Sequence, residues 1–405
     1  MKEHIAKMLA AQRGRHISFH TPGHKRRGAD ITELSYSDNL AAPRGVLAAA
    51  QADCARILGA DASFFLTDGS TSGVYSMLLA LRRAGAARVA VPVCAHVSVL
   101  RGCELAGLVP VPVPQEWERG IARQPSLSAC ERALSAADAL LVTSPDYYGY
   151  FPDLRGLAAL CAREQKPLLA DGAHGSHLHG TPMYAGNFAD MWVDGVHKSL
   201  PALTQGAVVS AKGAWAARLE AAVPYFRTTS PSYPILSSIE HAVKFPRSER
   251  TERAAAWAKA ALGAEPNDDW SKIVLPFGEK SGAARACLEA RGLYPEFDDG
   301  NYLMFYLSPA SRVRDIKTLV RLAKRLPRGE VRGAPHEKGS CGQKTAALPP
   351  EAALGRTCAQ TCGLFPPCVP VLLRGERVDE DAVRRLSGAL SAFGLEEGKI
   401  VVFED

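Results

Sequence analysis

Short apolar runs alternate with helical patterns between residues 62 and 211, and this rhythm constrains the fold more than any other feature of the chain. Each run is bounded by glycine, proline or polar residues and is too short for a helix, so it predicts a buried strand. Strands separated by helices form a mainly parallel sheet with helices on both faces. The predicted fold class is α/β, with seven strands at 62–67, 88–92, 108–113, 138–143, 166–171, 191–193 and 207–210.

Polar residues directly follow four of these predicted strands. They are the glycine-rich loop 68–73, His96, Asp171 and Lys198. In open α/β sheets, ligands bind beyond the carboxyl ends of the strands. We therefore expect the four segments to meet at one edge of the sheet and to form a single site.

Lys198 lies among small and hydroxyl residues just after the apolar strand 191–193. A lysine at this position is badly placed for solvation, and burial lowers a lysine pKa. A neutral amine in a pocket can form a Schiff base with an aldehyde. The hypothesis is that Lys198 carries pyridoxal 5'-phosphate (PLP), and the alternative is an ordinary solvated lysine.

Two other segments have the chemistry that PLP needs. The loop 68–73 offers backbone N–H groups, hydroxyls and a helix dipole to a phosphate, although Ser and Thr also cap many helices. Asp171 ends a predicted buried strand, and a buried carboxylate needs a cationic partner such as a protonated pyridine nitrogen. The same segment contains His174, His177 and His179, so a zinc site is an alternative there.

The length of 405 residues favours more than one domain. The sequence pattern changes near residue 270. From there on, glycine- and proline-rich loops separate fewer predicted strands and helices than in the segment 62–211. We expect an N-terminal arm over residues 1–45 and a large PLP-binding domain over 46–262. A smaller α+β domain over 263–405 is expected to close over the edge of the sheet.

Bulk properties limit the class of protein. The net charge of +6 is spread along the chain and does not indicate a nucleic-acid partner. There is no apolar run long enough to cross a bilayer, and the first residues do not resemble a signal peptide. A zinc site at Cys341, Cys358, Cys362 and Cys368 is conceivable, but ordinary reduced cysteines are favoured. We expect a cytoplasmic protein.

Five motifs together resemble the Orn/Lys/Arg decarboxylase family, the PLP-dependent basic amino-acid decarboxylases of fold type I, in its shorter bacterial form. The resemblance covers most of the chain and implies an aspartate aminotransferase-like large domain. The motifs are Phe19-His-Thr-Pro-Gly-His-Lys25, Phe64-Phe-Leu-Thr-Asp-Gly-Ser-Thr-Ser-Gly73, Thr143-Ser-Pro-Asp-Tyr-Tyr-Gly149, Asp171-Gly-Ala-His-Gly-Ser-His177 and His197-Lys-Ser-Leu-Pro-Ala-Leu-Thr-Gln205.

The resemblance implies roles for individual residues. Lys198 matches the lysine that binds PLP covalently, and Asp171 matches the acid that pairs with the pyridine nitrogen. His174 matches a histidine near the 3'-oxygen of the ring, and His96 matches the histidine that stacks on the ring face. His197 matches the histidine before the lysine, which contacts the phosphate or a carboxylate.

The phosphate cradle implied by the resemblance is Gly69, Ser70 and Thr71. The implied reaction removes CO2 from arginine, lysine or ornithine and returns a proton from Lys198 or His197, which gives the corresponding di- or polyamine. A basic side chain needs an acidic partner, for which the cluster Glu296, Asp298 and Asp299 is a candidate, with a solvated acidic turn as the alternative.

Members of this fold build the site across a subunit interface, so the resemblance also implies at least a homodimer. The loop from His16 to His24 is the candidate segment near that interface.

The sequence departs from the family pattern at several positions. Gly172 replaces a glutamate, Gly195 replaces a serine or threonine, and Val97 replaces a lysine. The element Phe365-Pro-Pro-Cys-Val-Pro370 matches its family counterpart only in part. Two alternatives therefore stay open: another fold type I PLP enzyme such as an aminotransferase, with Arg374 as a carboxylate clamp, or a catalytically impaired PLP-binding homologue.

Overall fold

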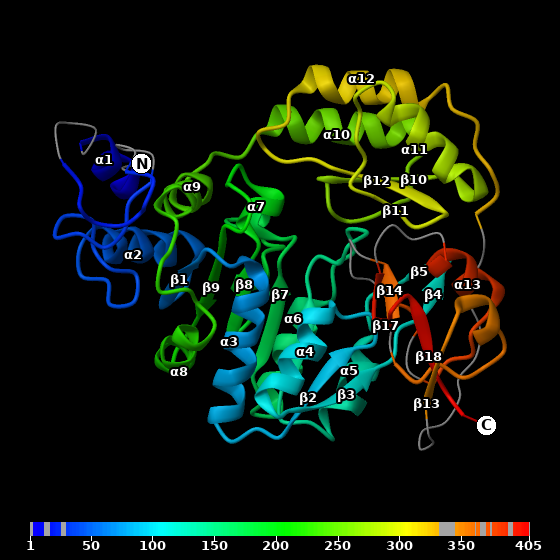
Figure 1. The fold of residues 1–405 in the computed structure, drawn as a ribbon, viewed down its shortest axis with the longest axis horizontal. Coiled ribbons are helices and arrows are strands. Elements are labelled where there is room, and N and C mark those ends of the chain that lie inside the picture. The colour runs from blue at the N-terminus through cyan, green and yellow to red at the C-terminus, as the bar shows by residue number, and fades with distance from the viewer. Residues whose placement is uncertain are drawn as a thin grey trace.

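A seven-stranded sheet forms the centre of the protein (Figure 1). The computed structural model describes residues 3–11, 17–25, 30–331, 345–360, 362–364, 370–372, 375–387 and 392–404. The strand order is β1-β9-β8-β7-β6-β2-β3, and only β9 runs antiparallel to its neighbours. The predicted mainly parallel seven-stranded sheet is thus confirmed. Its strands are β1 (Ala62–Leu66), β2 (Arg88–Pro92), β3 (Val109–Val113), β6 (Leu140–Thr143), β7 (Leu168–Gly172), β8 (Met191–Asp194) and β9 (Ala207–Ala211).

Helices cover both faces of this sheet because successive side chains of a strand point to opposite faces. In β6, for example, Leu140 and Val142 belong to one hydrophobic cluster and Leu141 to the other. The first cluster includes residues of α2 (Val46–Leu58), α5 (Leu127–Leu134), α6 (Leu154–Arg163) and α9 (Tyr233–Val243). The second includes residues of α3 (Gly69–Arg83), α4 (Val97–Ala106) and α8 (Trp215–Ala222).

The N-terminal segment is anchored on the same body. Helix α1 (His4–Ala11) buries Ile5 and Met8 beside α2 and α9. Glu240 of α9 accepts hydrogen bonds from the backbone N–H groups of His4 at 2.7 Å and Ile5 at 2.8 Å. A carboxylate at this position compensates the free N–H groups and the positive end of the helix dipole. Phe19, which belongs to the predicted interface loop, is 95% exposed. His16 of the same loop lies outside the described residues.

After α9 the chain builds a second compact unit. Its core combines α10 (Glu249–Leu262) with β10 (Lys272–Pro276), α11 (Ser281–Glu289), β12 (Tyr302–Tyr306) and α12 (Val313–Ala323), while β11 (Phe297–Asp298) forms the edge of its antiparallel sheet. This unit lies above the carboxyl ends of the central strands in Figure 1. The boundary proposed at residue 262 stays a prediction, and α10 itself packs against β10 and α12.

The last part of the chain forms small sheets around a separate hydrophobic cluster. They consist of β13 (Thr345–Leu348), β14 (Cys362–Leu364), β15 (Pro370–Leu372), β16 (Ala392–Phe393), β17 (Leu395–Glu396) and β18 (Lys399–Phe403), with helix α13 (Glu380–Ser387). The ribbon beside them is β4 (Trp117–Glu118) and β5 (Ile121–Ala122). Short single-turn helices lie at Ser176–Leu178, Ala185–Asn187, Val223–Tyr225, Gly278–Lys280 and Pro350–Ala353, and the four-residue helix α7 spans Val196–Ser199. Within the described ranges, no helix is long and apolar enough to cross a membrane.

Candidate active site

The segments predicted to meet at the sheet edge do meet there. Two cavities adjoin at the carboxyl ends of the central strands, and Ser70, His96 and Lys198 line both of them. The first cavity is also lined by Asp171 and His174. The second, of about 600 Å³, is lined on its other sides by Gly69, Thr71, Tyr75, Val97, Ser98, Arg101, His197, Thr204, Gln205, Ala392, Gly394 and Leu395.

Lys198 lies in α7, directly after β8, and is half-buried. Its Nζ atom is 3.2 Å from Nε2 of His174. Burial, together with the charges of Lys198 and Lys272, holds the pKa of His174 well below its usual 6.5. His174 is therefore neutral at physiological pH, and its Nε2 can accept a hydrogen bond from the lysine amine.

His174 is held in place by two tyrosines that the sequence analysis did not place in the site. The ring of Tyr306 from β12 stacks on it at 5.5 Å and 16°, and Tyr147 meets it edge-on at 4.8 Å. The hydroxyl of Tyr306 also donates to the backbone carbonyl of His174 at 2.8 Å. Because Tyr306 comes from the second unit, that unit takes part in positioning the histidine beside Lys198.

Asp171 is the next-to-last residue of β7 and is only 3% exposed. One of its oxygens accepts the backbone N–H of Ala173 at 3.1 Å, and no ion pair joins it to another side chain of the described ranges. Nearby, His96 caps the N-terminus of α4 by accepting the N–H of Ser98 at 3.1 Å. Burial lowers the pKa of His96 to about 4, although the charge of Asp171 acts in the opposite direction. His96 is thus a neutral, flat ring close to a buried carboxylate.

The lining of the second cavity has features that suit an anion. Gly69 has a φ of 78°, a conformation that side chains rarely adopt, and it begins α3 so that Ser70 and Thr71 lie in the first helical turn. The free N–H groups of such a turn attract phosphate. His197 is oriented by the bond between its Nδ1 and the carbonyl of Gly206 at 2.8 Å. Arg101, which the sequence analysis missed, adds a positive charge to the lining.

The residues present fit PLP. Asp171 is a buried carboxylate that forms no ion pair with a side chain of the described residues, as expected for the partner of a protonated pyridine nitrogen. Lys198 has its amine in the same cavity, and the start of α3 lies where a phosphate group needs donors. His96 and His174 are neutral and can border the ring without repelling its positive charge.

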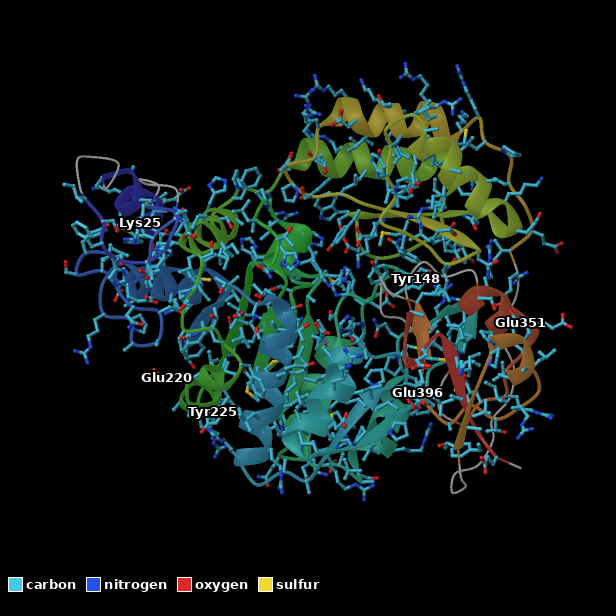
Figure 2. All side chains as sticks on the ribbon, viewed as in Figure 1. Lys25, Tyr148, Glu220, Tyr225, Glu351 and Glu396 are labelled. Carbon is cyan, nitrogen blue, oxygen red and sulfur yellow. The ribbon has the colours of Figure 1, made fainter. Side chains whose placement is uncertain are left out.

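The three residues of the predicted acidic cluster lie at different distances from this site. Glu296 is exposed and accepts the hydroxyl of Tyr147 at 2.9 Å, which brings it one side chain away from His174. Asp298 accepts the N–H of Gly300 at 2.9 Å. Neither Glu296 nor Asp298 lines the first cavity. Asp299 accepts the hydroxyl of Tyr148 at 2.5 Å. In Figure 2, Tyr148 lies where the second unit and the C-terminal sheets approach the central body.

Asp146 is a carboxylate that the sequence analysis missed and that does line the first cavity. Its Oδ1 atom accepts the N–H groups of Tyr148, Gly149 and Tyr150 at 2.8–2.9 Å. Burial raises the pKa of Asp146 to about 6, although these hydrogen bonds and the charge of Lys272 act the other way. The sequence feature that could have identified Asp146 is the motif from Thr143 to Gly149. The sequence analysis used this motif for the family resemblance alone.

The histidines considered as zinc ligands have different partners. His174 contacts Lys198, whereas Nε2 of His177 lies 2.9 Å from Oδ1 of Asp269, with both side chains fully buried. Nδ1 of His179 bonds to the carbonyl of Ser176 at 2.8 Å. In the described ranges, no group of three possible metal ligands comes together. Cys358 and Cys362 are buried free thiols, and Cys341, Cys368, Arg374 and the segment 365–369 lie outside those ranges.

Two of the departures from the family pattern lie where backbones approach closely. A Cβ atom at Gly195 would lie 2.4 Å from the carbonyl oxygen of Ala173, and one at Gly172 would lie 2.9 Å from that of Val193. The ends of β7 and β8, which carry Asp171 and lead to Lys198, are thus packed against each other without room for side chains. In this chain the two glycines are required by the local packing.

We expect Gly195→Ser to destabilise the protein by about 1–3 kcal/mol, because the turn before Lys198 must shift to relieve the clash. Urea unfolding at neutral pH measures this change. Gly23→Ser is the matched control, since a Cβ atom there has nothing within 4 Å. Equal stabilities of the two variants would show that position 195 tolerates a side chain.

Comparisons with known proteins indicate the family of this chain. A family model described as the Orn/Lys/Arg decarboxylase major domain matches residues 23–260. The protein YaaO of Bacillus subtilis (strain 168) is 26% identical, over 97% of this chain and 95% of that protein. The arginine decarboxylase of the same strain is 24% identical, over 95% of this chain and 93% of that enzyme.

The fold has a solved counterpart in the constitutive lysine decarboxylase of E. coli. The two structures superpose with a TM-score of 0.75 at 17% sequence identity, over 100% of this chain and 82% of that chain. The predicted fold type I class is thereby confirmed. Because the family model matches more than half of the sequence and the residues of the site fit the cofactor, the chain belongs to the Orn/Lys/Arg decarboxylase family and is a decarboxylase that depends on pyridoxal 5'-phosphate.

Proposed function

We propose that this protein decarboxylates a basic amino acid, arginine, lysine or ornithine, to the corresponding amine and CO2. The observation that carries the proposal is the meeting of Lys198, His174 and Asp171 in one cavity whose lining also includes the carboxylate of Asp146. The relatives named arginine decarboxylase and lysine decarboxylase support the class of substrate. We further propose that the protein works in the cytoplasm as a homodimer with a shared site, in which the loop from His16 to His24 lies near the interface.

Each site residue has a proposed role that follows from its position in the cavity. PLP, when bound, supplies an electron sink for the electrons that CO2 leaves behind. We propose that Asp171 holds the pyridine nitrogen in its protonated form. Lys198 would bind the cofactor, release it to the substrate and then carry a proton to Cα, with the neutral Nε2 of His174 able to accept a hydrogen bond from its amine.

The remaining predicted residues are proposed to orient the cofactor. His96 would lie against the ring face, and Gly69, Ser70 and Thr71 would hold the phosphate at the start of α3. His197 is proposed to contact the phosphate through Nε2, because its Nδ1 is engaged by Gly206. Glu296 and Asp298 stay predictions as partners of the substrate side chain. We propose Asp146 as a third candidate, because it lines the first cavity.

The test is a turnover screen with the PLP-loaded protein and each of the three amino acids. Release of CO2 together with the matching amine supports the proposal, and formation of a keto acid would instead indicate an aminotransferase. Borohydride reduction followed by peptide mapping should place the cofactor on Lys198. A cofactor-saturated protein that leaves Lys198 unlabelled would contradict the assignment of the site.

The Asp146 proposal predicts a pH dependence. The pKa of about 6 means that this carboxylate is charged at pH 7.5 and becomes neutral as the pH falls through about 6. A neutral carboxyl no longer attracts a cation, so KM for the basic amino acid should rise over that range. In Asp146→Asn, KM should be about tenfold higher at pH 7.5, as for the loss of a hydrogen bond between charged groups, and the rise near pH 6 should be absent.

Two variants serve as comparisons for Asp146→Asn. Asp315→Asn removes an exposed carboxylate of α12 and should leave KM unchanged. Glu296→Gln tests the predicted acidic cluster in the same assay. If Glu296→Gln raises KM while Asp146→Asn does not, the cation is bound by the predicted cluster instead.

A further inference from the structure

Lys272 is a buried lysine that the proposed chemistry does not use. It begins β10 in the second unit, its side chain is fully buried, and it lines neither of the two cavities. In Figure 1, the sheet that contains β10 faces the central body. A buried ammonium group is costly unless nearby groups compensate its charge. The partners of Lys272 therefore show what this charge acts on.

The contacts of Lys272 reach the two segments that frame His174. Its Nζ atom donates to the backbone carbonyl of Asp146 at 2.5 Å. Nζ also lies 5.3 Å from the ring centre of Tyr306 and 6.0 Å from that of Tyr147, distances at which a ring face attracts a cation. Tyr306 is directly opposite Lys272 in the pairing of β10 with β12, so their side chains are neighbours on one face of the sheet. These two tyrosines are the ones that hold His174.

The charge of Lys272 acts on the side chain of Asp146 as well. Burial raises the pKa of Asp146 to about 6, and the positive charge of Lys272 is one of the effects that keep this pKa from rising further. Cys94, Tyr148 and Tyr150 also lie near Asp146, but burial raises the pKa of each of them, so they are uncharged at neutral pH. The charged or titratable groups that share the first cavity with Asp146 are His96, Tyr147, Asp171, His174, Lys198 and Arg385.

Lys272 keeps its charge over the pH range in which Asp146 titrates. Burial and the charge of Lys198 lower the pKa of Lys272 to about 8. The carboxylates of Asp269, Asp146 and Glu296 act in the opposite direction. Because a pKa of about 8 lies above the pKa of about 6 of Asp146, the lysine is protonated while that carboxyl changes its charge. Lys272 thus acts on Asp146 as a fixed positive charge.

We propose that Lys272 is a positioning residue for Asp146, an inference that rests on the proposed function. The lysine holds the backbone of Asp146 through its carbonyl and favours the negatively charged form of its side chain. A charged Asp146 attracts the cationic end of a basic amino acid, whereas a neutral one does not. Through Tyr147 and Tyr306 the same ammonium group supports the histidine beside Lys198, so one buried cation of the second unit serves two parts of the site.

The test measures KM for the basic amino acid between about pH 5 and 8, in the PLP-loaded wild type and in Lys272→Met. Methionine keeps an unbranched side chain and removes the charge. In the wild type, KM should rise as the pH falls through about 6. Loss of the positive charge raises the pKa of Asp146, so in the variant this rise should lie about one pH unit higher, the low end of the shift that a neighbouring charge produces. At about pH 6.5, KM of the variant should be roughly two- to threefold above that of the wild type.

Lys259→Met is the matched control. Lys259 belongs to the same unit, burial lowers its pKa to about 8, and its Nζ donates to Oδ1 of Asn267 and to the carbonyl of Asp269, both at 2.6 Å. The control should leave the midpoint of the KM profile near pH 6, although it also removes a charged donor. Lys272→Arg keeps the charge and should return the midpoint toward the wild-type value. A merely structural role of Lys272 would lower stability without moving the midpoint.

Infrared difference spectra follow the same carboxyl without turnover. The band of a protonated carboxyl that is missing in Asp146→Asn belongs to Asp146. Its pH midpoint should lie near 6 in the PLP-loaded wild type and about one pH unit higher in Lys272→Met. Lys272→Gln keeps an N–H donor for the carbonyl and has no charge, so it should show the same shift and replaces Lys272→Met if that variant does not fold.

The outcomes separate the two proposals. If the wild type turns over a basic amino acid and the carboxyl of Asp146 titrates at the same pH with and without the charge of Lys272, the role of Lys272 is refuted and the proposed function stands. An equal shift in Lys259→Met would refute that role as well, because the effect would then be a general one. If the wild type turns over none of the three amino acids but the infrared midpoint moves as expected, the proposed function fails and the action of Lys272 on Asp146 stands.

Discussion

Lys198→Ala is expected to lower the rate of decarboxylation by roughly 10⁴-fold, the upper range for a positioned acid–base group. The reason is that the proposed roles give one amine both the binding of the cofactor and the transfer of the proton, and no other lysine of the described residues lines either cavity. The variant should also lose the covalent label after borohydride reduction. Steady-state assays of CO2 release and peptide mapping measure the two effects.

Lys212→Ala is the control for this variant. Lys212 is also partly buried, but its amine donates to the carbonyl of Gly186 away from the cavities. It should retain both the activity and the label at Lys198. Full activity of Lys198→Ala, or a label on another lysine, would overturn the assignment.

Asp269→Asn is expected to destabilise the protein by about 3–5 kcal/mol, the typical cost of disrupting a buried, hydrogen-bonded pair that contains a carboxylate. Oδ1 of Asp269 and Nε2 of His177 are 2.9 Å apart, and both side chains are fully buried. The backbone N–H of His177 donates to Oγ of Ser199 at 3.2 Å, and Ser199 directly follows Lys198 in the sequence. The pair joins the second unit to the turn that carries Lys198. Urea unfolding should show the loss, with a weaker retention of PLP.

The pH dependence of this effect has a definite sign. Burial alone would raise the pKa of Asp269, but the charge and hydrogen bond of His177 outweigh it and hold the pKa well below 3.8. A depressed pKa contributes stability that is present above about pH 4 and is lost as the pH falls through the folded value. The difference in unfolding free energy between wild type and Asp269→Asn should therefore shrink below about pH 4.

Asp268→Asn is the matched control, because Asp268 is the exposed neighbour and its carboxylate accepts a backbone N–H from Phe151 at 3.1 Å. It should cost well under half as much as Asp269→Asn. A double variant with His177→Asn tests whether the two losses are coupled. Simple additivity would contradict a direct interaction between the two side chains.

The central sheet could be predicted from the sequence because its signal is local. Each strand is a short apolar run with its own boundaries, and the rule that ligands lie beyond the carboxyl ends of parallel strands placed Ser70, His96, Asp171 and Lys198 at one edge. The structure confirms that these residues line common cavities. The cofactor and the family followed from the same local segments.

Other parts of the site could not be predicted because they depend on contacts between distant segments. Tyr306 lies in β12, and its stacking on His174 depends on how the second unit packs over the sheet. No pattern in the sequence singled out Asp269, which is a fully buried partner of His177. The tight fit at Gly195 depends on Ala173 from the neighbouring loop, which no pattern around Gly195 contains.

The sequence by itself determined the sheet, the edge at which ligands bind and the residue types that identify the chemistry, because hydrophobic periodicity and strand ends are properties of short segments. Only the tertiary structure decided which remote side chains complete the site, among them Tyr306 and Asp146. These side chains are positioned by packing between units far apart in the chain. Burial then sets their charge and their unmet hydrogen bonds, which no local pattern encodes.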